Sequence, residues 1–181
     1  MILHGYWRSG TSYRTRIALN LKGVAYEQTA LDLRTGAQKS DAYLRLNPQG
    51  LVPALETGDG LVLTQSPAIL EWLEETHPEP PLLPRDAAGR AQVRAMAAVI
   101  GCDIHPLNNL RVLKAVRGLG ADQAGVDAWA GQWIIDGFTA LEALIVRYGE
   151  GWCFGGTPTL ADCYLMPQLY SARRFNVDLA A

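Results

Sequence analysis

The side chains best suited to chemistry lie near the start of the chain, where Arg8 is followed by the hydroxyl residues Ser9, Thr11 and Ser12. Residues 13–22 predict a helix, so these hydroxyls occupy the loop at its N-terminus. Free backbone N–H groups and the positive end of the helix dipole make such a loop an anion site. Taken alone, the hydroxyls are better explained if Ser12 or Thr11 merely caps the helix.

The elements around this loop predict how it is held. Residues 1–6 are short and largely apolar, as in a buried strand, and residues 24–33 predict a second strand. The helix between them is expected to end at Gly23. Its predicted buried face consists of the apolar residues at four-residue spacing, Tyr13, Ile17 and Leu21. Strand, helix and strand at this length predict a βαβ unit.

The next segments complete a small sheet. Residues 36–46 predict a short helix or an irregular segment. A strand is expected at or just after Pro53, because proline cannot donate to a sheet ladder, and a glycine-containing turn then leads to a returning strand at residues 61–64. A further helix should follow, with Ser66 as its N-cap and Pro67 as its first residue.

The proline-rich segment 78–86 is the one credible domain boundary, a stiff linker between residues 1–77 and 87–181. Beyond it the pattern is helical throughout, and Pro106 should kink or break the first of these helices. Two apolar stripes at three- and four-residue steps predict core positions: Val93, Met96, Ala97, Ile100, Ile104 and Leu107, and then Val126, Trp129, Trp133, Ile134, Phe138, Leu141 and Ile145.

A third helix of the second part is predicted to begin at Thr159. Thr159 and Asp162 have the spacing of a capping box, in which the two side chains satisfy each other's backbone N–H groups. Asp162 is therefore interpreted as a structural carboxylate rather than a catalytic one.

Composition excludes several classes of function. The net charge of −2 argues against nucleic acid or an anionic membrane as a partner. No run of eighteen apolar residues predicts a membrane span, and the start of the chain does not resemble a signal peptide. The three cysteines, Cys102, Cys153 and Cys163, lack metal-ligand spacing with the histidines, so we expect reduced thiols, no metal and a cytoplasmic protein.

The whole chain resembles the cytosolic glutathione transferases, in which a thioredoxin-like βαβ–ββα domain precedes an all-helical domain. Val52-Pro53 resembles the family's cis-proline, and the residue before that proline binds the cysteinyl part of glutathione. Gln65-Ser66 resembles the clamp for the γ-glutamyl group. The resemblance thus implies an α/β plus all-α fold, a glutathione site and a homodimer that packs through the first helix after the linker.

Residues 8–19 resemble the zeta-class signature, which runs Ser-Ser-Cys-x-x-Arg-x-Arg-Ile-Ala-Leu. Residues 47–53, 65–71, 102–109 and 172–175 also resemble that class. Two departures stand out. Gly10 and Thr11 replace the second serine and the cysteine of the signature, so the catalytic hydroxyl must come from Ser9, Thr11 or Ser12. The chain also ends at residue 181, where family members usually continue, so we expect a shortened helical domain.

The zeta class catalyses cis–trans isomerisation of a double bond conjugated to carbonyl groups: the glutathione thiolate adds, the new single bond rotates, and elimination follows. A free thiol is only about 3% ionised at pH 7, and lowering its pKa by two units, at about 2.7 kcal/mol, gives roughly 75%. Ser9 is the first candidate donor, with Thr11 and Ser12 behind it. The resemblance further implies glutathione contacts from Gln49, Val52, Pro53, Gln65, Ser66, His105 and Asn108, and substrate contacts from Arg8, Arg111 and Arg174.

The main hypothesis is a maleylacetoacetate isomerase of aromatic amino-acid breakdown, acting on a small unsaturated keto dicarboxylate. The nearest alternative is a maleylpyruvate isomerase of gentisate-type degradation. Leu110 stands where an additional arginine would grip that smaller substrate, which favours the first. Two further alternatives are a broader transferase acting on halogenated acids and a binding or scaffolding protein without catalysis. A scaffold would not need Arg8, Ser9, Gln65 and Ser66 together.

Overall fold

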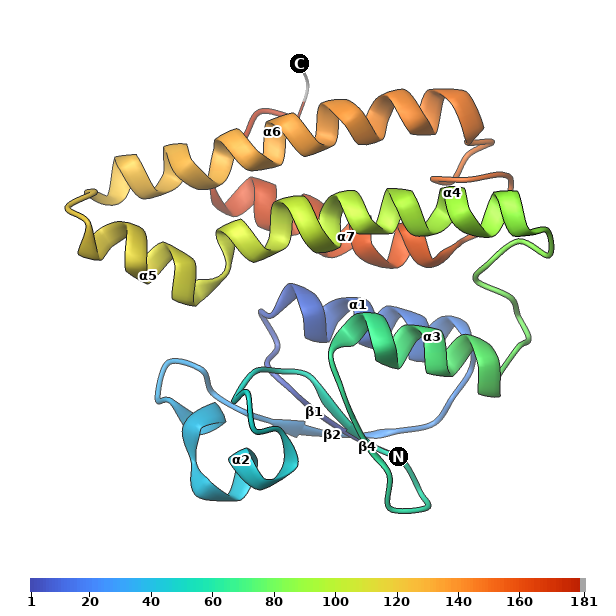
Figure 1. Ribbon diagram of the computed structural model, residues 1–181, viewed down its shortest axis with the longest axis horizontal. Helices are drawn as coiled ribbons and strands as arrows, with labels where there is room; N and C mark the ends of the chain where they lie inside the picture. The colour runs from blue at the N-terminus through green and yellow to red at the C-terminus, as the bar shows by residue number, and fades with distance from the viewer. Residues whose placement is uncertain (180–181) are drawn as a thin grey trace. The chain divides into compact units, whose positions relative to one another are not determined.

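The computed structural model describes residues 1–179 and divides into two compact units, Met1–Leu82 and the remainder from Leu83. The boundary falls inside the proline-rich segment. Figure 1 shows strands in the first unit and helices alone in the second. The predicted fold class, a thioredoxin-like α/β domain followed by an all-helical one, is confirmed.

A four-stranded mixed sheet forms the centre of the first unit. Its strands are β1 (Ile2–Gly5), β2 (Glu27–Ala30), β3 (Ala54–Glu56) and β4 (Val62–Thr64), in the order β2-β1-β3-β4. β1 pairs with β2 in parallel and with β3 antiparallel, and β3 and β4 form the hairpin. β2 is shorter than the predicted 24–33, and all four of its residues are exposed at the sheet edge.

Helices flank this sheet. α1 (Gly10–Leu21) and α3 (Ser66–Thr76) lie on one side of it, and the short helices η1 (Ala37–Lys39) and α2 (Asp41–Leu46) lie away from them (Figure 1). The buried core between sheet and helices consists of Leu3, Ala18, Leu19, Ala54, Leu55, Ile69, Leu70 and Leu73.

Two helix starts differ from the sequence prediction. Ser9, rather than Thr11 or Ser12, is the N-cap of α1, and its side chain accepts from the Ser12 N–H. Ser66 is the first residue of α3, and Gln65 takes the cap position with φ 67°. The predicted buried face of α1 is also displaced: Tyr13, Ile17 and Leu21 are half-buried, whereas Ser12, Arg14, Thr15, Ala18 and Leu19 are buried. The predicted end of α1 is confirmed, because Gly23 follows it with φ 65°.

The second unit is a bundle of helices. α4 (Ala87–Ala98) continues into η2 (Val99–Ile104), which is π-helical, and then into the 3-10 helix η3 (His105–Asn108). α5 (Leu110–Gly118), α6 (Gln123–Tyr148) and α7 (Leu160–Arg174) follow. The predicted break at Pro106 is confirmed, because regular α-helix ends before it and resumes only at Leu110.

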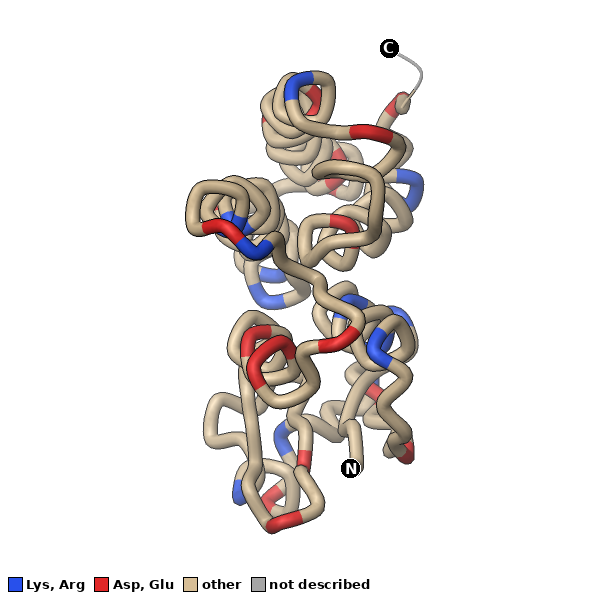
Figure 2. The backbone as a smooth tube through the Cα atoms, turned by 90° about the vertical axis from the view of Figure 1, so that its right-hand side faces the viewer, with Lys and Arg blue, Asp and Glu red and all other residues tan. Residues whose placement is uncertain are grey.

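The apolar stripes form the core of this unit. Val93, Met96, Ile100 and Ile104 are fully buried, as are Val126 and Ile134 of α6. Leu107 and the aromatic side chains of the second stripe are half-buried. Figure 2 shows that acidic and basic residues are interspersed in both units, in keeping with the net charge of −2. No helix within residues 1–179 is both long enough and apolar enough to cross a membrane.

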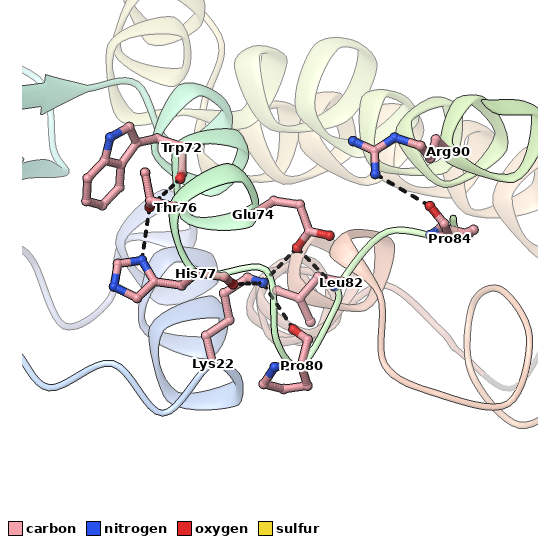
Figure 3. Close-up of polar contacts among 9 residues, drawn as sticks. All are labelled: Lys22, Trp72, Glu74, Thr76, His77, Pro80, Leu82, Pro84 and Arg90. Carbon is pink, nitrogen blue, oxygen red and sulfur yellow. Dashed lines mark hydrogen bonds and ion pairs between the residues drawn. The ribbon is translucent and has the colours of Figure 1, made fainter. Parts of the chain in front are cut away.

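A buried ion pair holds the last segment of the first unit, residues 77–82, in place (Figure 3). The Lys22 ammonium donates to Glu74 Oε2 at 2.7 Å, to the His77 carbonyl at 2.7 Å and to the Pro80 carbonyl at 3.0 Å. Glu74 Oε2 also accepts from the Leu82 N–H at 3.0 Å. The three hydrogens of the ammonium are therefore all used. This cluster holds the segment after α3 against both helices, so the first unit extends beyond α3 to Leu82.

Candidate functional site

The hydroxyls at the start of α1 form one connected set. Ser9 Oγ accepts from the Ser12 N–H at 3.3 Å and lies 2.8 Å from Thr11 Oγ1. Thr11 Oγ1 in turn donates to the Val52 carbonyl at 2.9 Å. Ser12 is fully buried, and its Oγ accepts from the Tyr6 N–H at 3.3 Å. Ser9 and Thr11 are half-buried, so they are accessible to a ligand and Ser12 is not.

The loop before Pro53 is held from two sides. The Tyr43 hydroxyl and the Asn47 amide both donate to the Leu51 carbonyl, at 2.6 and 2.7 Å. The next carbonyl, that of Val52, is held by Thr11, and the Val52–Pro53 peptide bond is cis. Burial raises the pKa of Tyr43 to about 12, so its hydroxyl keeps the proton that it donates. The predicted contact residues Val52 and Pro53 are thus brought next to the hydroxyls of α1.

The start of α3 contains a hydroxyl without a partner. Ser66 is 2% exposed, and no described residue bonds to its Oγ. Burying a hydroxyl without a hydrogen bond is costly, so such an atom indicates a place for a ligand. It lies in the first turn of an eleven-residue helix, where free N–H groups and the helix dipole favour a carboxylate. An amino-acid carboxylate such as that of the γ-glutamyl group fits this position.

Gln49 and Gln65 meet beside this helix start. Gln65 Nε2 donates to Gln49 Oε1 at 2.5 Å, and Lys39 Nζ donates to the Gln49 carbonyl at 3.0 Å. Lys39 was not among the predicted site residues, because a single exposed lysine in a polar segment gives no signal in a sequence. It places a cation beside two predicted glutathione residues.

Arg8 is exposed at the end of the loop before α1, and its guanidinium lies 5.7 Å from the centre of the Trp7 ring. Within residues 1–179 it makes no ion pair, so its charge is available to an anion. The nearby carboxylate of Asp32 is instead paired with Arg34 at 2.6 Å. Hydrogen bonds from Arg34 lower the pKa of Asp32 to about 2, and the charge of Arg8 lowers it further to a smaller extent.

The remaining predicted residues belong to the second unit. Asn108 is 7% exposed, and its Nδ2 has no partner among the described residues. His105 is half-buried at the start of η3, and Arg111 is exposed in the first turn of α5. Arg174 is exposed at the last residue of α7, 5.6 Å from the centre of the Phe175 ring. That these residues share one ligand with Ser9 and Arg8 stays a prediction.

The cysteines do not offer a nucleophile at this site. All three are free, and only Cys102 is exposed. Burial and the charge of Asp162 raise the pKa of the Cys153 thiol, which therefore stays protonated. Asp162 itself forms the predicted capping box with Thr159: its carboxylate accepts from the Thr159 N–H, and the Thr159 side chain accepts from the Asp162 N–H. The Thr159 hydroxyl also donates to the same carboxylate. Within residues 1–179, no group of three or more acidic, histidine and cysteine side chains could hold a metal ion.

Comparison with known proteins gives consistent matches. Residues 8–76 match the family model of the glutathione S-transferase N-terminal domain. A maleylpyruvate isomerase from a Ralstonia species is 60% identical, and the match covers 99% of this chain and 85% of that protein. A maleylacetoacetate isomerase from Pseudomonas aeruginosa is 52% identical, over 100% of this chain and 85% of that protein.

Solved structures give the same result. The holo structure of a maleylpyruvate isomerase, a bacterial glutathione S-transferase of the zeta class, superposes with a TM-score of 0.96 at 59% identity, covering 99% of this chain and 85% of that one. A maleylacetoacetate isomerase from Methylobacterium extorquens with bound malonate and glutathione superposes with a TM-score of 0.94 at 40% identity, covering 100% of this chain and 86% of that one.

Proposed function

Because the chain belongs to the zeta-class glutathione S-transferases, we propose that it is a glutathione-dependent cis–trans isomerase that converts maleylacetoacetate to fumarylacetoacetate. Relatives matched over nearly the whole chain are named maleylpyruvate isomerase and maleylacetoacetate isomerase, and a further maleylacetoacetate isomerase was solved with glutathione bound. The observation in this chain that carries the proposal is the unpartnered, buried Ser66 hydroxyl at the start of α3, which fits the γ-glutamyl carboxylate.

Glutathione supplies, when bound, a thiolate that adds to the cis double bond, permits rotation and then leaves. The protein must keep that sulfur ionised and hold the tripeptide still. Ser9 caps α1 and remains accessible, so its hydroxyl and the free N–H groups of the first turn are the proposed donors to the sulfur. Ser12 is the weaker candidate, because its buried Oγ is bonded to the Tyr6 N–H.

The two ends of glutathione differ in what they need. Gln65 and Ser66 are proposed to bind the γ-glutamyl group, and the peptide at Val52 to bind the cysteinyl group. We add Lys39 as the cation for the glycyl carboxylate, since it lies within hydrogen-bonding distance of the Gln49 carbonyl, beside the Gln49–Gln65 pair. A lysine is suited to this because it neutralises a carboxylate as a point charge.

The substrate carries two carboxylates, and arginines match them best because the guanidinium fork accommodates two oxygens. Arg8 is the first candidate, because it is exposed and makes no ion pair among residues 1–179. Arg174 and Arg111 are proposed to contribute from the second unit, with His105 and Asn108 near the ligand. The relative from Methylobacterium was solved with malonate, a small dicarboxylate, and glutathione both bound.

Maleylpyruvate isomerase is the second candidate function. Higher identity to the Ralstonia enzyme, 60% against 52% for the Pseudomonas enzyme, favours it. Leu110 favours maleylacetoacetate, because this exposed first residue of α5 offers no charge to a more compact dianion. The two substrates therefore have to be compared directly.

We also propose that the protein is a cytoplasmic homodimer. Its free cysteines fit a reducing compartment. An open groove of about 410 Å³ in the second unit, lined by Val99, Leu107 and Trp133 with Asp103 and Asp136 beside them, offers surface that a second copy would cover. Size-exclusion chromatography with light scattering tests the dimer, and a monomeric mass at micromolar concentration would contradict it.

The decisive experiment measures isomerisation of maleylacetoacetate and maleylpyruvate side by side by ultraviolet absorbance, with and without glutathione. We expect a glutathione-dependent rate that Arg8→Ala abolishes and the exposed control Arg45→Ala leaves intact. Retention on immobilised glutathione should weaken in Ser66→Ala and persist in Ser171→Ala. No rate on either substrate would overturn the isomerase proposal, and retention unaffected by Ser66→Ala would overturn the assignment of the clamp.

A further inference from the structure

Three hydrogen bonds connect the Ser12 N–H, Ser9, Thr11 and the Val52 carbonyl in sequence, and they run in one fixed direction. A carbonyl oxygen can only accept, so the single hydrogen of Thr11 Oγ1 points to Val52 O, 2.9 Å away. Thr11 Oγ1 therefore accepts from Ser9 Oγ at 2.8 Å, and the Ser9 hydrogen is the one shared between them. Ser9 Oγ accepts from the Ser12 N–H. The order is Ser12 N–H to Ser9, Ser9 to Thr11, and Thr11 to Val52.

This order commits the hydroxyl hydrogen of Ser9 to Thr11. Ser9 can donate to a thiolate only if that hydrogen turns away from Thr11 Oγ1 and toward the sulfur. The exchange gives up a neutral hydrogen bond and gains one to an ion, which is the stronger kind. Thr11 keeps its own bond to Val52 throughout, because its hydrogen does not have to move.

Thr11 thus has two effects on a bound tripeptide, and they oppose each other. By holding the Val52 carbonyl it restrains Val52 from the Pro53 side, and the Val52 N–H, which lies on the preceding peptide, donates to no described residue and is available to a ligand backbone. By accepting from Ser9 it competes with the sulfur for the same hydrogen. We propose that Thr11 is a positioning residue that strengthens glutathione binding through Val52 while restraining the donation of Ser9 to the sulfur. This inference rests on the proposed function, because it concerns how the protein binds glutathione and ionises its sulfur.

Thr11→Val tests both effects, because valine keeps the shape and removes donor and acceptor together. Without its partner, Val52 should bind glutathione less well, and loss of one hydrogen bond corresponds to an about fivefold rise in Kd. Ser9 should then donate to the sulfur without competition, which lowers the pKa of the bound thiol by up to about one unit. Calorimetry gives the Kd, and thiolate absorbance against pH gives the thiol pKa.

A Kd that rises while the thiol pKa falls distinguishes this role from a general loosening of the site, which would raise both the Kd and the thiol pKa. Thr11→Ser keeps the hydroxyl and should restore both values to within about twofold and a few tenths of a unit. Thr15→Val is the matched control, because the Thr15 hydroxyl bonds only to the Thr11 carbonyl inside α1. In Ser9→Ala, adding Thr11→Val should no longer lower the thiol pKa. Thr11→Ala repeats the test if the valine variant does not fold.

A Kd within twofold of wild type in Thr11→Val, or a thiol pKa that rises, would overturn the proposal. Neither the Kd nor the thiol pKa requires turnover, so failure of this proposal can be distinguished from failure of the proposed function. A wild-type protein that binds glutathione but isomerises nothing overturns the activity and leaves this test intact. A wild-type protein that does not bind glutathione overturns both.

Discussion

Replacing Asp162 should cost far more stability than its place at a helix start suggests. Asp162 Oδ2 accepts from the Thr159 N–H at 2.7 Å and from Thr159 Oγ1 at 2.9 Å, and Oδ1 accepts from the Cys153 N–H at 2.9 Å. Asp162 is 8% exposed and both of its partners are buried. Asp162→Ala leaves two buried N–H groups without acceptors, at about 1–3 kcal/mol each, so we expect a loss of roughly 3–5 kcal/mol.

Asp122 provides a matched control. It caps α6 through one bond to the Gly125 N–H at 2.8 Å, but it is exposed. Water can replace that bond, so Asp122→Ala should cost about 1 kcal/mol. Urea unfolding followed by circular dichroism measures both variants in the same unit of the protein.

Asp162→Asn separates the structural role from a catalytic one. The amide keeps one acceptor oxygen, so the loss should fall between those of the two alanine variants, and kcat should stay near wild type where the protein is folded. Equal losses in Asp162→Ala and Asp122→Ala would refute the reasoning from burial. An inactive but fully stable Asp162→Asn would refute the structural assignment.

Three further predictions concern the fold. Lys22→Met should lower the free energy of unfolding by about 3–5 kcal/mol because it leaves the buried Glu74 carboxylate without its cation, whereas Lys22→Met combined with Glu74→Leu should lose much less in the same urea titration. Burial raises the pKa of Tyr43 from its ordinary value of 10 to about 12, so the folded state holds that proton more tightly. Stability present below pH 10 should therefore be lost as the pH rises toward 12, and alkaline titration of Tyr43→Phe should show a shallower loss. Gly137→Ala should cost about 1–3 kcal/mol, seen as a lower urea midpoint, because its Cβ would overlap the buried Ile104 side chain.

Sequence patterns predicted the elements of this fold because their signals are local. Pro106 has no N–H to donate, so an α-helix does not continue through it undisturbed. Thr159 and Asp162 cap a helix through side chains three residues apart. The buried face of α1 was mispredicted because that helix packs with residues such as Ser12 and Thr15, whose small side chains allow close approach. The spacing of apolar residues alone does not reveal that a hydroxyl side chain is buried.

The candidate site was predictable only in part. Resemblance to a family pointed to Ser9, Val52 and Ser66, and the structure adds how they are connected. The bond from Thr11 to Val52 joins residues forty-one positions apart, and the cation of Lys39 approaches Gln49 from another segment. Neither contact has a sequence signature, because each depends on how the loop before Pro53 folds back toward α1.

The Lys22–Glu74 pair restricts which substitutions these two positions can accept during evolution. Either single replacement leaves an unpaired charge in the interior and should be removed by selection, whereas we expect an exchange of both residues for apolar ones to cost much less. The two positions are therefore expected to vary together among descendants of this protein, as a linked pair. The His77 and Pro80 carbonyls that Lys22 also holds come from the backbone, so the identities of those residues remain free to drift.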